Sequence, residues 1–340
     1  MKVLVNFRLS FVVLILLVLV SPVFAQRVME IKLSSLVPEN TPWGQSINRL
    51  AAEWSRITNG QIVMKVFHGG TAGGEAQTMA LLRSNQLQAA VLTTMGLGTV
   101  TPELMSVSYP FLIRDDAELE EVMRRIKPDL EVKMQQNGFV TLAWANAGWV
   151  KLFARSPVFT PDDLRKVKLG SSQEQPELMQ AFRQMGYQVV PAELNEVIMA
   201  MQSGRIDVTY ISPVFAAGTQ VFGVAKNMSS INVAPFMGGI LMNEVTWRRV
   251  PERFKPALLE ACKNVEKEIE TTIAKLDSDA LTTMVRHGLI VHQLTPAQNQ
   301  IWYDETDRYE ERMIGGVKPI FNREYYFRIK NILTEIRKGK

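Results

Sequence analysis

The chain has few of the residues from which metal and redox sites are built. It contains one cysteine, Cys262, which cannot form an internal disulfide, and three histidines, His68, His287 and His292. The histidines lie far apart or at a five-residue spacing that does not place them on one helix face, and none has a cysteine nearby. Zinc sites need three or four such ligands together, so no metal is expected. Cys262 is interpreted as a free structural thiol.

The signature motifs of common enzymes are also missing. There is no Gly-x-Ser-x-Gly and no phosphate-binding loop, and the glycines of "HGGTAGGEAQT" do not match the dinucleotide-binding fingerprint. Glu193 and Glu196 fall on adjacent turns of a predicted helix, a spacing that is common on solvated surfaces. The sequence therefore predicts neither an enzyme nor a bound cofactor.

Charge is neither abundant nor strongly of one sign. Charged residues make up 21% of the chain and hydrophobic residues 46%, and 38 Lys and Arg stand against 34 Asp and Glu. The small, evenly scattered basic excess does not favour nucleic acid as a partner. A chain of 340 residues with this composition is typical of a globular protein with two domains.

Only the N-terminus carries a long apolar run. Lys2 and Arg8 precede "LSFVVLILLVLV", about 12 apolar residues, and "SPVFA" ends at Ala25. A membrane span needs about 20 apolar residues, so residues 1–25 are predicted to be a cleaved signal peptide rather than a retained anchor. No cysteine follows the cleavage point, which argues against lipid attachment. The mature chain is expected in the periplasm.

Strands and helices alternate along the first part of the mature chain. A predicted strand at 29–37 is followed by a helix at 41–60 and a second strand at 61–70. Thr41 is a favourable N-cap with Pro42 directly after it. The pattern repeats with helices at 73–87 and 115–138 and strands at 88–94 and 139–148. Such alternation is typical of an α/β domain with a parallel sheet.

A second run of this kind begins at Val167, with predicted strands at 167–169, 187–192 and 205–212. After Met237 the pattern becomes mostly helical, and 251–288 is long enough to run from one domain across to the other. The predicted α/β domains comprise 26–147 with about 237–275, and 148–236 with about 276–340. No low-complexity linker separates them.

The order of these segments resembles one family. "IKLSSLVPENTPWGQSINRLAAEWSRITNG" is similar to the opening of the periplasmic solute-binding subunits of TRAP transporters, the DctP-like family. Four later segments resemble the family in the same order: "TPELMSVSYPFLIRDD", "FTPDDLRKVKL", "LNEVIMAMQSGRIDV" and "NEVTWRRVPERFKPALLEA". The resemblance covers nearly all of the mature chain.

This resemblance implies a two-domain, type II periplasmic-binding-protein-like α/β fold with a hinge, a ligand cleft and a long helix spanning both domains. It implies capture of a small molecule in the cleft and delivery to membrane permease subunits. By analogy with some TRAP-like systems, an accessory helical-repeat protein is a further candidate partner. A sensor or scaffold subunit that docks a partner protein is an alternative function for the same fold.

Three positions depart from the family pattern for binding organic acids. In the family, one arginine clamps the carboxylate of the ligand, and the resemblance places this position at Gly170. The family's helper arginine falls on or next to Val150, and an asparagine of a family motif falls at Ile211. A carboxylate buried without a partner costs several kcal/mol. The predicted ligand is therefore apolar or amphipathic, with Gly170 opening space for it. An acid held by another cation, such as Lys168, Lys151 or Arg205, is the alternative.

The candidate ligand-binding residues are those at or near the family's ligand-contacting positions. They are Trp43, Thr93, Thr94, Trp149, Val150, Gly170, Leu194, Tyr210, Ile211 and Phe215.

Overall fold

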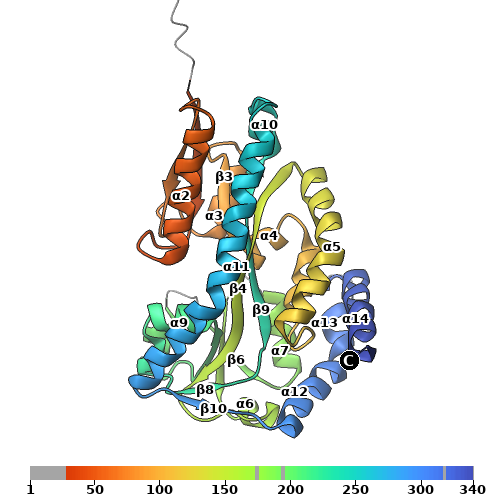
Figure 1. Cartoon of the computed structure of the whole chain (residues 1–340). Coiled ribbons are helices and arrows are strands. Elements are labelled where there is room, and N and C mark those ends of the chain that lie inside the picture. Colours follow the sequence, from red (N-terminus) through yellow and green to blue (C-terminus); the bar gives the residue numbers. More distant parts are fainter. Residues whose placement is uncertain (1–27, 173–175, 193–195, 317–318, 340) are drawn as a thin grey trace, which may run out of the picture.

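A computed structural model describes residues 28–339 except 173–175, 193–195 and 317–318. The described chain forms two α/β halves that share continuous strands and one long helix (Figure 1). This is the predicted fold class, and the prediction is confirmed. In the described residues no helix is both long and apolar enough to cross a membrane.

The first half is built on three parallel strands with helices packed around them. The central strand β1 (Met29–Ser35) pairs with β2 (Ile62–Phe67) on one side and β3 (Ala89–Thr93) on the other. Thr41 caps the first helix as predicted, because its hydroxyl accepts a hydrogen bond from the Gly44 N–H. The helical elements are α2 (Pro42–Ile57), α3 (Glu75–Arg83), α4 (Thr94–Gly98), the 3-10 helix η1 (Pro102–Ser108) and α5 (Asp116–Gln136).

Two long strands cross from one half to the other. They are β4 (Phe139–Ala154) and β9 (Ala234–Asn243), which are antiparallel partners. β9 also pairs antiparallel with β3, so the expectation of a parallel sheet was wrong at this strand. The prediction of mostly helix after Met237 is confirmed, since the strand ends at Asn243 and most of the following chain is helical. Gly238 and Gly239 allow the close approach, since a Cβ at either would lie 2.9 Å from a carbonyl oxygen of a neighbouring strand.

The second half continues the sheet from the far end of β4. Next to β4 lies β7 (Val208–Ile211), followed by β5 (Lys168–Ser171) and β6 (Gln188–Pro191). A capping box between Thr160 and Asp163 begins the short helix that leads into β5. The remaining elements are α6 (Pro161–Arg165), α7 (Pro176–Gln184), α8 (Val197–Gln202), α9 (Pro213–Gly218), η2 (Val221–Gly223), β8 (Asn227–Ser229) and β10 (Ile290–His292).

One helix runs along both halves. After α10 (Glu244–Arg249), helix α11 (Lys255–Arg286) has 32 residues and is therefore about 48 Å long. It contacts α2 in the first half, β4 at the crossing and α9 in the second half (Figure 1). The predicted domain-spanning helix is thus confirmed.

The C-terminal helices divide between the halves. Helix α12 (Pro296–Arg308) contacts α6 and α13 (Glu310–Ile314) contacts α7, whereas α14 (Arg323–Lys338) packs on η1 and α5. Arg337 of α14 binds the buried Glu118 of α5 through two hydrogen bonds of 2.8 Å. The predicted assignment of everything after about residue 276 to the second domain therefore does not match the contacts of α14.

Candidate ligand-binding cleft

A cavity of about 940 Å³ lies where the two halves face each other. The first half contributes the end of β3 and the start of α4. The crossing strands β4 and β9 form one wall, and β5, β7, α7, α9 and α12 form the rest. Strand ends opening toward a cleft are the usual ligand-binding position in open α/β sheets.

Seven of the predicted ligand-binding residues line this cavity. They come from β3, α4, β4, β5, β7 and α9 and are Thr93, Thr94, Val150, Gly170, Tyr210, Ile211 and Phe215. Residues from six elements of the chain are thus brought together.

Trp149 and Trp43 are not among the lining residues, contrary to the prediction. Side chains alternate along β4, so Val150 and Leu152 face the cavity while Trp149 faces away. The Trp149 indole is buried and donates a 2.8 Å hydrogen bond to Asp116. Trp43 lies in the first turn of α2, a helix that packs on β2 and α11. Leu194 lies outside the described residues.

The first half meets the cavity with a carboxylate that is already hydrogen bonded. Glu75, at the start of α3, accepts hydrogen bonds from the Thr93 N–H at 2.5 Å, the Thr93 hydroxyl at 2.8 Å and the Gly96 N–H at 2.9 Å. The neighbouring Thr94 hydroxyl donates to the Met237 carbonyl at 3.0 Å. These bonds fix the turn from β3 into α4, and they place a buried acidic side chain beside the cavity.

The second half contributes hydroxyl groups and aromatic rings. The Ser171 and Tyr210 hydroxyls, on the neighbouring strands β5 and β7, are 3.1 Å apart, and either can be the donor. The Phe182 ring contacts the Tyr210 ring edge to face, with centroids 6.3 Å apart. Both rings line the cavity. This wall can therefore bind an apolar group next to a neutral hydrogen-bonding group.

Gly170 lines the cavity with its backbone only. A Cβ at this position would lie 2.7 Å from Ile206 Cδ1 and 3.5 Å from the Ala192 Cβ. The expectation that Gly170 opens space for the ligand therefore needs correction, because the buried Ile206 occupies the position next to it. At this position, where the family resemblance predicts a clamping arginine, the chain offers no side chain to a ligand.

Three cations are candidates to replace a carboxylate-clamping arginine, and all three lie outside the cavity wall. Lys168 is exposed and donates to the Gly204 carbonyl at 2.8 Å. Lys151 points away from Val150 and binds the Ser230 carbonyl and the Asn232 side chain, both at 2.6 Å. Arg205 pairs with Glu196 at 2.9 Å on the surface. None of the three lines the cavity.

The charged residues among the described lining residues are both acidic, Glu75 and Glu305. Glu305 lies on α12 with its side chain 6% exposed and is paired with Arg165 of α6, which also binds Asp162 at 2.6 Å. Arg165 itself is not a lining residue. A ligand in this cavity thus meets apolar groups, hydroxyls and two carboxylates.

Two half-buried groups of opposite charge, Lys151 and Asp277, lie behind the cavity wall, on the other face of β4. Burial lowers the pKa of Lys151 to about 8, although Asp277 and Asp116 oppose the shift. Burial likewise raises the pKa of Asp277 of α11 to about 6, opposed by Lys151. Asp277 lies close to Gly148 of the crossing strand, because a Cβ at Gly148 would lie 2.6 Å from the Asp277 carboxylate.

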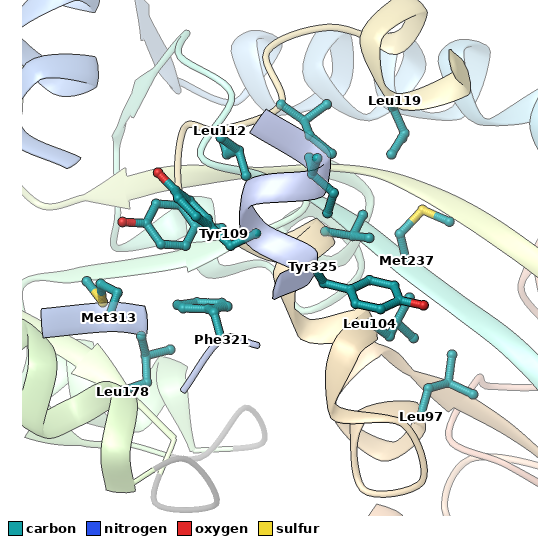
Figure 2. Close-up of a cluster of buried hydrophobic side chains, with 14 of the residues drawn as sticks. Leu97, Leu104, Tyr109, Leu112, Leu119, Leu178, Met237, Met313, Phe321 and Tyr325 are labelled. Carbon is teal, nitrogen blue, oxygen red and sulfur yellow. The ribbon is translucent and has the colours of Figure 1, made fainter. Parts of the chain in front are cut away.

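The C-terminal segment contributes a wall of the cavity that was not predicted from the sequence. Trp302, Glu305, Met313 and Phe321 line the cavity, together with Phe182 of α7. Met313, Leu178 and Phe321 lie close together in Figure 2. No local motif marks these residues, since they reach the cavity only through the packing of α12 and α13 on α6 and α7.

Comparison with known proteins identifies the family. The model of the DctP family, described as bacterial extracellular solute-binding protein, family 7, matches residues 33–315. The chain belongs to this family. The predicted resemblance to TRAP solute-binding subunits is thereby confirmed, as is the prediction that the protein is not an enzyme, because DctP proteins bind solutes.

Curated DctP relatives are distant but cover most of the chain. The "C4-dicarboxylate-binding protein DctB" of Bacillus subtilis is 23% identical over 313 residues, 90% of this chain and 86% of the relative. A "Solute-binding protein" of Verminephrobacter eiseniae is 23% identical over 269 residues, 78% of this chain and 79% of the relative.

Solved structures of the same fold include a TRAP periplasmic solute-binding protein from Pseudomonas putida F1 with bound D-glucuronate. It has a TM-score of 0.79 at 19% identity and covers 89% of this chain and 96% of its own. A second, from Sulfurospirillum deleyianum with bound succinate, has a TM-score of 0.77 at 24% identity and covers 89% and 99%. These likenesses establish the fold.

Within the described residues, no group of three or more His, Cys, Asp or Glu side chains is placed to hold a metal ion.

Proposed function

We propose that this DctP protein is the extracytoplasmic solute-binding subunit of a TRAP transporter and that its ligand is apolar or amphipathic. It takes the ligand into the cleft between the two halves and delivers it to membrane permease subunits. The proposed ligand class rests on the types of residue that line the cavity. Among the described residues that form it there is no Lys or Arg, while two buried carboxylates are present.

Electrostatics argues against an organic acid in this wall. An acid would be placed in a partly dry cavity beside Glu75 and Glu305 without a positive partner among the described lining residues. Burying an uncompensated carboxylate costs several kcal/mol, whereas micromolar binding amounts to about 8 kcal/mol. Burial of apolar ligand surface instead contributes about 25 cal/mol per Å².

The size of the cavity supports the same proposal. Its 940 Å³ lies near the upper end of the roughly 300–1,000 Å³ range of small-molecule sites. A four-carbon dicarboxylate has about eight heavy atoms and occupies about 240 Å³ at most, taking the ~30 Å³ of a water molecule for each atom. Such a ligand would leave most of this cavity unfilled.

An organic acid held in another way is the second candidate, and the named ligands of relatives favour it. The Bacillus subtilis relative is named for C4-dicarboxylates, and the structures above contain D-glucuronate and succinate. Gly170 has no side chain that could clamp a carboxylate. Lys168 and Lys151, which could replace such a clamp, are bonded elsewhere.

A thermal-unfolding panel decides between the two. Purified, ligand-free protein is heated with succinate, malate or D-glucuronate and, separately, with straight-chain alkanols from hexanol to dodecanol. A ligand at a hundred times its Kd raises the free energy of unfolding by about 2.7 kcal/mol. We expect the alkanols to raise the Tm and the acids to leave it unchanged. A clear Tm increase with an acid alone would contradict the apolar ligand.

We also propose that residues 1–25 are a cleaved signal peptide, so that the mature protein begins at Gln26 in the periplasm. The extracellular family assignment supports export. The intact mass of the exported protein tests the cleavage position, because a retained leader would add 25 residues.

A further inference from the structure

The cavity extends beyond the cleft into the second half of the molecule. Its mouth is partly open, with Leu36 40% exposed and Phe215 and Phe236 half-buried. Its far end is enclosed by six residues that are each less than 8% exposed. We call this end the inner chamber; it is formed by Leu164, Leu178, Met185, Tyr187, Trp302 and Met313.

The inner chamber is not an ordinary packing gap. Protein interiors are filled to crystal-like density and contain few voids larger than a water molecule. Here four separate elements, α6, α7, α12 and α13, pack around a continuous space that opens toward the cleft. Figure 2 shows Met313 and Leu178 from two of these elements close to each other, with Phe321 beside them.

Polar groups are few in the inner chamber and are already engaged. Glu305, which is as buried as the chamber residues, is paired with Arg165, and the Tyr187 ring is packed against Phe182 with centroids 6.2 Å apart. The Trp302 N–H donates to the Phe159 carbonyl at 2.9 Å. A hydroxyl pair, Ser171 and Tyr210, lines the same cavity from the neighbouring strands β5 and β7. This arrangement suits an apolar chain inside and a neutral polar group outside.

Resting on the proposed function, we propose that the inner chamber holds the apolar chain of an uncharged amphipathic ligand, whose polar group stays beside Ser171 and Tyr210. The depth of the chamber then selects ligands by chain length. Each added methylene increases affinity by roughly fourfold until the chamber is filled, the factor expected for moving one CH2 out of water. Beyond that length the affinity stops rising.

A series of straight-chain alkanols measures this limit directly. Affinities are determined for the wild-type protein and for Leu178→Ala, which enlarges the chamber. The control is Met179→Ala, because Met179 is the next residue on α7 and is equally buried but does not line the cavity. We expect Leu178→Ala to extend the limiting chain length by about three carbons, the number that the substitution removes. Met179→Ala leaves the limit unchanged.

A second measurement does not depend on a core substitution. Trp302 lies in the chamber wall, so an alkanol with a terminal bromine quenches its fluorescence when the chain end reaches the chamber. We expect 12-bromododecanol to quench and 4-bromobutanol to have no effect, and the quenching to disappear in Trp302→Phe.

The outcomes separate this inference from the proposed function. Alkanol binding without Trp302 quenching, or with the same chain-length limit in all three proteins, would contradict binding of the apolar chain in the inner chamber. The proposal of an apolar ligand would still stand. Binding of succinate but of no alkanol would contradict both.

Discussion

Ile206 Cδ1 lies 2.7 Å from the point that a Cβ atom on Gly170 would occupy. The absence of a side chain at this position is thus tied to the packing of a buried isoleucine on the segment before β7. Restoring a side chain at residue 170 would require Ile206 to move.

This contact predicts a coupled pair of substitutions. Gly170→Ala should lower the free energy of unfolding by about 1–3 kcal/mol, the usual cost of overpacking a core. In a chain that also carries Ile206→Val, which removes Cδ1, the cost of Gly170→Ala should nearly vanish. Denaturant unfolding of the four proteins gives the coupling energy. Additive effects would show that Ile206 does not set the limit at residue 170.

Gly148 offers a similar test at the crossing strand. Its φ is +92°, and a Cβ there would lie 2.6 Å from the Asp277 carboxylate. Gly148→Ala should destabilise the protein through both backbone strain and this contact. Gly138→Ala is the control, because Gly138 has a φ of +85° but open space around its Cβ position. We expect Gly148→Ala to be the costlier by about 1–3 kcal/mol. Equal effects would leave backbone strain as the whole cause.

Asp277 predicts a dependence of stability on pH. Because its folded pKa is raised from 3.8 to about 6, the folded protein binds more protons than the unfolded chain between these values. The stability of the wild type relative to Asp277→Asn should therefore fall as the pH rises from about 4 to 6. We expect a change of roughly 1 kcal/mol, after allowing for solvent screening of a partly exposed carboxyl. A pH-independent difference in unfolding free energy would contradict the raised pKa.

Substituting the two candidate cations tests their role in binding. Lys168→Met and Lys151→Met should each leave alkanol affinity unchanged, because neither lysine lines the cavity. Lys151→Met should lower the free energy of unfolding more than Lys168→Met does. The reason is that Lys151 is bonded to Ser230 and Asn232 within the fold, whereas Lys168 is exposed. Isothermal titration with decanol and denaturant unfolding measure the two quantities. Loss of alkanol binding in either variant would show that the substituted lysine takes part in ligand binding.

The sequence was sufficient to predict the two α/β halves, because strand and helix patterns and the cap at Thr41 are local signals. It also predicted α11, whose length shows directly in the helical pattern. The strand β9 was missed because its pair of glycines weakens the strand pattern, and their role depends on the backbone of β3 and β4.

The site was predicted in part for the same reason. Thr93, Val150 and Tyr210 lie at strand positions that family motifs mark, and the structure brings them together. Trp149 is not a lining residue because adjacent residues of a strand point to opposite faces, and on β4 it is Val150 that faces the cavity. Met313 and Trp302 could not be found, since only the tertiary packing of α12 and α13 carries them to the cavity.

Native mass spectrometry of the protein, gently purified after export, tests the central claim most directly. The wild-type protein should carry a bound molecule that is released on unfolding and is uncharged, with an apolar chain. A bound organic acid such as succinate, in place of an apolar molecule, would contradict the account.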